Sequence, residues 1–281
     1  MEVEESSQNV SITTIVENLH ITDSITVRSL TDLSIQYIQS AALYARLCYE
    51  VENRHKPYIP NSLPPEEFDE LLAEHDAHAI SSIFAAVAFL ESTINKFFLD
   101  AVGQIEEMVN KFSVDTKISE DGITHKQLES KTTQLLLNEM IKSWVREKDV
   151  GPVHEKFDNI LGSFGKEKFN RGDYPFQDIA LLVNLRNALV HYKPEWVTVY
   201  TDRPLPEEVD NKKLEQLRKK HIPRSPFIPG TERQFFPKQC LSHGHAKWAV
   251  NVSLAFVDGF FEKMNRPYPY NHIRSRLRTE F

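Results

Sequence analysis

Residues 175–192 read PFQDIALLVNLRNALVHY, and their pattern of apolar residues indicates a helical protein. Its apolar side chains recur at helical spacing, which places them along one side of a helix. They are Ile179, Leu182, Val183, Leu189 and Val190. Pro175 suits the first position of a helix, and Pro194 disfavours helical backbone at the residue before it. The sequence therefore predicts one helix over residues 175–192.

Arg186 falls near the middle of this apolar stripe when the helix is drawn at about 100° per residue. A buried arginine is costly unless an opposite charge and hydrogen bonds compensate it. Asn187 and His191 lie on the flank of the stripe, four residues apart and therefore adjacent on one face. We expect a partner for Arg186 elsewhere in the chain.

The strongest helical pattern upstream spans about residues 77–108, and it also turns a charge inward. Its apolar positions surround Glu91, and Asn95 follows one turn later. We therefore expect Glu91 and Arg186 to meet in the core as a charge-assisted pair. The alternative is that both helices are rotated and both charges reach solvent.

Helical spacing also predicts the remaining elements, and no long segment alternates as a strand would. The predicted helices span about residues 30–51, 131–148, 153–170, 206–220 and 246–264, the third ending near Gly162 or Gly165. We expect a polar N-terminal arm over residues 1–25 and a single all-α domain over residues 26–281. That domain includes a proline-rich insertion at 197–243 and a basic C-terminal tail at 265–281.

Composition and net charge limit the classes of fold and function that this chain can have. The chain has 281 residues, and its nine glycines are few, which favours helices over turn-rich sheets. Two cysteines cannot form a disulfide framework, and we expect a reducing cytoplasm. The acidic, polar start is unlike a secretory signal, and no apolar run approaches the length of a membrane span. The net charge of -7 is unlike that of a protein that coats nucleic acid.

Residues 185–192, LRNALVHY, resemble the signature of the HEPN family, the higher eukaryote and prokaryote nucleotide-binding domain. The signature is an arginine followed by a polar residue and then by a histidine a few residues on. Residues 88–91, together with Asn95, resemble the preceding helix of that family. The resemblance covers roughly residues 30–195 and the last helix, whereas the insertion at 197–243 lies outside it.

This resemblance implies an up-and-down helical bundle that forms a homodimer with two motifs facing one cleft. It implies a metal-independent endoribonuclease without a cofactor, of the kind found in toxin–antitoxin and defence systems, with RNA as substrate and an antitoxin as a partner protein. His191 would be the general acid or base, Arg186 would stabilise phosphate charge, and Asn187 would orient the histidine or contact phosphate. The alternative is a non-catalytic HEPN module that binds RNA, nucleotide or a protein partner.

Other polar residues carry weaker signals for binding. Lys193 and the tail residues Arg274, Arg276 and Arg278 are candidates for RNA contact, although basic runs usually form solvated surface. Two groups resemble metal ligands but match no standard spacing. They are Cys240 with His243 and His245, which we expect in a solvated loop, and His75 with His78, which we expect at a solvated helix start. The sequence predicts no metal site.

Overall fold

The computed structural model describes residues 31–55, 64–114, 151–193, 212–228 and 236–281. All of its helices belong to one compact unit, Asp32–Phe281. The predicted arm at 1–25 and the predicted helix at 131–148 lie outside the described residues.

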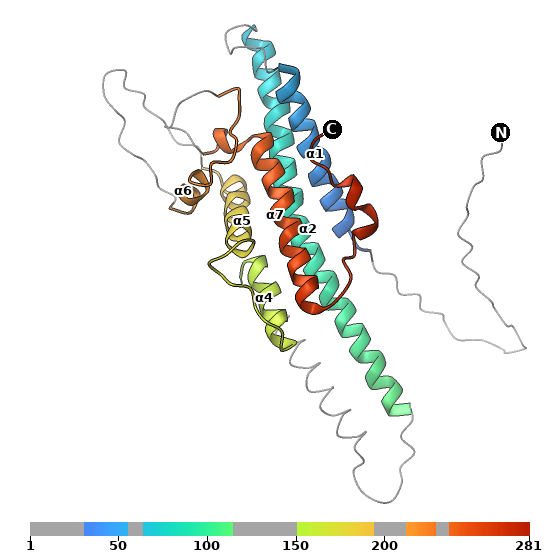
Figure 1. Ribbon diagram of the computed structural model, residues 1–281. Coiled ribbons are helices and arrows are strands. Elements are labelled where there is room, and N and C mark those ends of the chain that lie inside the picture. The colour runs from blue at the N-terminus through green and yellow to red at the C-terminus, as the bar shows by residue number, and fades with distance from the viewer. Residues whose placement is uncertain (1–30, 56–63, 115–150, 194–211, 229–235) are drawn as a thin grey trace, which may run out of the picture. The chain divides into compact units, whose positions relative to one another are not determined.

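Long helices form the centre of this unit (Figure 1). Helix α1 (Ser34–His55) packs along α2 (Pro65–Val114), and α7 (His243–Met264) packs against both. Helices α4 (Val153–Ser163) and α5 (Phe176–Val190) contact α2 and α7. The short α6 (Lys212–Arg218) lies against α5, and 3₁₀ helices η2 (Lys238–Cys240) and η3 (Asn271–Arg276) flank α7 in sequence. The described residues contain no strand, which confirms the predicted all-α class.

Helix α2 begins twelve residues before the apolar pattern starts, at the end of the double proline, where Glu66 and Glu67 indicate the first turn of a helix. Its first residue is Pro65, whose missing N–H costs nothing at a helix start, and Glu66 and Glu67 place negative charge in the first turn. Helix α7 also begins earlier, at His243, because the Ser242 side chain accepts a hydrogen bond from the backbone N–H of His245. Both starts follow local capping chemistry rather than the apolar pattern.

Small side chains bring α1 close to α2. Ala41, Ala42 and Ala45 are fully buried, and the Ser82 hydroxyl of α2 donates to the Ala41 carbonyl oxygen over 2.9 Å. Aromatic rings fill the space between α4 and α7, where Phe157 meets Phe260 edge to face at a centroid distance of 4.9 Å. This dense core holds α2 and α5 in place, and these helices carry Glu91 and Arg186.

The described part of the predicted insertion is not separate from the helical core. Gln239, Cys240 and Leu241 are buried, and the Ser242 hydroxyl donates to the Pro223 carbonyl oxygen over 2.8 Å. Gly244 lies so close to that carbonyl that a Cβ atom there would overlap it. This segment therefore forms a loop that packs against the start of α7 at Pro223.

One segment of the described chain, Pro65–Ala101 of α2, is long and apolar enough to cross a membrane by length and composition. The most apolar 18-residue window of this segment has a mean hydropathy of 1.5, and half of that window is buried inside the protein. Core helices of helical proteins meet the same criterion, so this segment is weak evidence for a membrane span. Polar and charged residues divide this segment into short apolar pieces, so it does not stand out as one long apolar run in the sequence.

Candidate functional site

Arg186 on α5 and Glu91 on α2 are joined as predicted. The Arg186 Nη2 atom donates a hydrogen bond to Glu91 Oε1. The expected burial of the pair is wrong, because 26% of the Arg186 side chain and 48% of the Glu91 side chain are exposed. Leu185 is fully buried instead, so α5 is rotated and Arg186 sits at the margin of the buried face.

Asn187 and His191 lie at the exposed end of α5. The helix ends at Val190, and the backbone N–H of His191 donates to the Asn187 carbonyl oxygen over 3.0 Å. Lys193 is exposed two residues further on, and Asn95 is exposed one turn after Glu91 on α2. The structure therefore brings Arg186 against Glu91, and it leaves Asn187 and His191 accessible to a ligand.

This arrangement can bind an anion. A guanidinium group has five N–H donors, and the hydrogen bond to Glu91 uses one of them. Arginine matches phosphate oxygens in a forked geometry, and the exposed imidazole of His191 offers ring nitrogens for hydrogen bonds. Binding phosphate therefore does not require Arg186 to leave Glu91.

The basic tail lies elsewhere on the described surface. Arg274 donates to both carboxylate oxygens of Asp258 over 3.0 and 2.7 Å, which occupies its fork. Arg276 and Arg278 are exposed and line a groove of about 720 Å³ together with Arg46 of α1. No residue of α5 lines that groove, so the structure does not join these tail residues to the site around His191.

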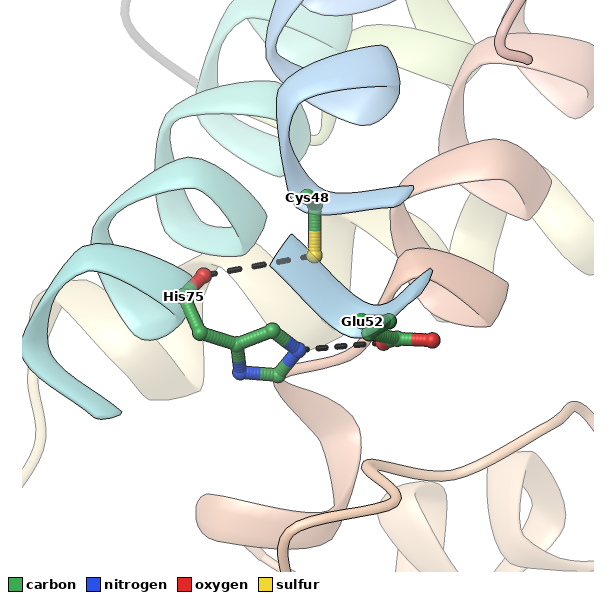
Figure 2. A group of neighbouring side chains, drawn as sticks. All are labelled: Cys48, Glu52 and His75. Carbon is green, nitrogen blue, oxygen red and sulfur yellow. Dashed lines mark hydrogen bonds and ion pairs between the residues drawn. The ribbon is translucent and has the colours of Figure 1, made fainter. Parts of the chain in front are cut away.

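A second polar group, between α1 and α2, was missed from the sequence. Figure 2 shows Cys48 and Glu52 of α1 facing His75 of α2. Cys48 and His75 are fully buried, and His75 Nε2 lies 3.0 Å from Glu52 Oε1. The expected solvated helix start around His75 is wrong, because α2 begins at Pro65, ten residues before His75, and packs against α1. The spacing of Cys48 and Glu52, four residues apart on one face, was the signal available in the sequence.

Carboxylates dominate the electrostatics of this second group. Burial opposes a charge on His75, but its interactions with Asp76, Cys48 and Glu52 outweigh burial and raise its pKa to about 11. Burial raises the pKa of Asp76, yet His75 and Lys238 together hold it below its usual value. Lys238 Nζ contacts Asp76 Oδ2 over 2.6 Å. The carboxylates of Glu52 and Asp76 therefore pair with His75 and Lys238.

Cys240, His243 and His245 do not lie in a solvated loop, contrary to expectation. All are buried at the start of α7, where the Gly244 contact with Pro223 closes the loop over them. His245 Nδ1 lies 2.8 Å from the Ser242 hydroxyl, and His243 Nε2 lies 3.2 Å from the Thr279 carbonyl oxygen. Among the described residues, these side chains do not form a group with metal-ligand geometry.

The chain matches no family model, no curated protein and no solved structure. The likeness to the HEPN family therefore rests on the residues quoted above.

Proposed function

We propose that this chain is a HEPN-like, metal-independent endoribonuclease whose active site is formed by Arg186, Asn187 and His191. The observation that supports it most is that Asn187 and His191 are exposed in the last turn of α5 and at its end, while Arg186 in the same turn is anchored by Glu91. An arginine that is held by a carboxylate has less side-chain freedom left to lose when it binds phosphate. Binding therefore costs less conformational entropy than it would for an unsupported arginine.

RNA cleavage without a metal needs a base at the 2′-hydroxyl, an acid at the leaving 5′-oxygen and a cation for the charge that develops on phosphorus. His191 serves one proton-transfer role, and Arg186 stabilises the phosphate charge. Asn187 lies one turn before His191 on the same face and orients the imidazole or the phosphate. A single histidine fills a single role, so the proposed enzyme works as a homodimer with two motifs facing one cleft.

The biological setting belongs to the same proposal. A free endoribonuclease damages its own cell, so a toxin or defence effector acting in the cytoplasm would be controlled by an antitoxin. The -7 net charge argues against general affinity for nucleic acid, and it is consistent with cleavage that depends on a local site.

The direct test is incubation of purified protein with total RNA in the presence of EDTA. Wild type is compared with His191→Ala and with His272→Ala, which removes another exposed histidine. We expect cleavage by wild type and by His272→Ala, and none above background by His191→Ala. Equal cleavage by all preparations would indicate a contaminating nuclease and would count against the proposed site.

A second function, a non-catalytic HEPN module that binds a protein partner, is favoured by one observation. Val190 and Tyr192 flank His191 and are exposed although they are large and apolar. Exposed apolar side chains around a polar centre are typical of protein interfaces. Wild type that binds RNA or a partner without cutting any RNA would favour this second function.

A further inference from the structure

We propose that Cys48, Glu52 and His75 bind one Zn²⁺ ion that clips the end of α1 to α2. Each residue offers one ligand atom, and these three atoms all lie within 4.8 Å of one another. Two ligands come from one helical face and the third from the facing helix (Figure 2). This site is separate from Arg186, Asn187 and His191 and does not depend on the function proposed for them.

The distances are close to those of a zinc site. Bond lengths of about 2.0–2.3 Å in a tetrahedron put neighbouring ligand atoms roughly 3.3–3.6 Å apart. His75 Nε2 and Glu52 Oε1 are already 3.0 Å apart. Since the ligand atoms all lie within 4.8 Å of one another, the Cys48 sulfur has to approach the other two by roughly 1.5 Å at most. Three protein ligands leave the fourth position to a water molecule.

Neighbouring groups orient the ligands. Asp76 Oδ1 lies 3.4 Å from His75 Nδ1, the nitrogen on the far side of the ring from Glu52, and the two atoms are close but not hydrogen-bonded. A carboxylate behind a ligating imidazole is the usual arrangement in zinc sites, because it fixes the tautomer and the ring orientation. The backbone N–H of His243 donates to Glu52 Oε1 over 2.7 Å and so positions the second ligand from α7.

The charges and ligand types select the metal. A thiolate and an imidazole favour zinc over magnesium or calcium, which prefer oxygen ligands alone. With Cys48 deprotonated and His75 neutral, Zn²⁺ balances the charges of Cys48, Glu52, Asp76 and Lys238.

Burial points to a structural role. Cys48 and His75 are fully buried and only 13% of the Glu52 side chain is exposed, so a large substrate cannot reach the metal. Cys48 packs with Ala79 and Leu241, and Leu189 of α5 contacts the same small cluster. A metal here therefore stabilises the contact of α1 and α2 beside the end of α5.

The test is the zinc content of the protein. Protein purified without chelator or histidine tag is loaded with equimolar Zn²⁺ and dialysed. Its bound metal is then measured by mass spectrometry. We expect one zinc ion per chain in wild type and in Cys240→Ser, which changes the other buried cysteine. Cys48→Ser and His75→Gln should lose the ion, and Asp76→Asn should bind it about 10- to 100-fold more weakly. His191→Ala should keep it, so this proposal and the ribonuclease proposal fail separately.

Cobalt provides the second measurement. Co²⁺ added to metal-free wild type should give a near-ultraviolet thiolate-to-cobalt absorption that Cys240→Ser keeps, and metal should raise the melting temperature. If Cys48→Ser does not fold, Glu52→Gln replaces it, because this ligand is the least buried. Wild type that retains no zinc and shows no thiolate absorption would overturn the proposal. Zinc retained equally by folded Cys48→Ser would overturn it as well.

Discussion

Arg186 of α5 donates a hydrogen bond to Glu91 of α2 at a place where 48% of the Glu91 side chain stays exposed. The pair is therefore partly solvated, although each residue lies among apolar neighbours in its own helix. Solvent weakens the contribution of such a pair to stability, whereas exposure keeps the guanidinium within reach of a phosphate. This position favours a role in binding over a role in folding.

The first prediction concerns Arg186→Ala. The free energy of unfolding should fall by about 1 kcal/mol or less, because exposed ion pairs contribute little. The cleavage rate should fall by about 100- to 1,000-fold, as expected for losing one donor to developing charge. Urea denaturation and a cleavage assay measure the two effects. Arg171→Ala, which removes an exposed arginine near α4, should leave both almost unchanged. A loss of several kcal/mol in Arg186→Ala would mean that the pair is structural.

The second prediction concerns the start of α7. A Cβ atom at Gly244 would overlap the Pro223 carbonyl oxygen, so Gly244→Ala should force the two segments apart. Overpacking of this kind costs about 1–3 kcal/mol of unfolding free energy. At Gly172 the nearest atom to a Cβ lies 3.7 Å away, and Gly172→Ala is the matched control. Equal denaturation midpoints for the two variants would show that the loop does not dock as described.

The third prediction concerns stability against pH. Burial, and then the nearby Arg224 charge, lower the pKa of His245 from 6.5 to about 3. Between these values the unfolded chain takes up a proton that the folded chain does not, so folding should weaken as pH falls. The slope from this one group is at most about 1.4 kcal/mol per pH unit. His245→Gln should reduce the slope of stability between about pH 6.5 and 4, measured by urea denaturation. An unchanged slope would contradict the burial of a neutral His245.

Helical spacing was enough to predict the all-α class and the contact of Glu91 with Arg186. It was not enough to predict their exposure, because the rotation of α5 depends on which apolar residue fits best against its neighbours. Leu185 occupies the buried position. The group around His75 depends on a second helix and on a helix start that the apolar pattern placed too late. A contact between two helices leaves no periodic pattern in the sequence of either helix alone.

If His191 transfers a proton during RNA cleavage, its loss should slow the cleavage step itself. A defined RNA is cut with excess enzyme in EDTA, and the rates of wild type and His191→Ala are compared. We predict a rate about 100- to 10,000-fold lower for the variant, with unchanged melting because His191 is exposed at the end of α5. Melting is followed in the same buffer, since a chelator that removes zinc would lower stability in both proteins alike. The wild-type products should end in 2′,3′-cyclic phosphate, as attack by the 2′-hydroxyl requires. A folded His191→Ala variant that cuts at the wild-type rate would contradict the account.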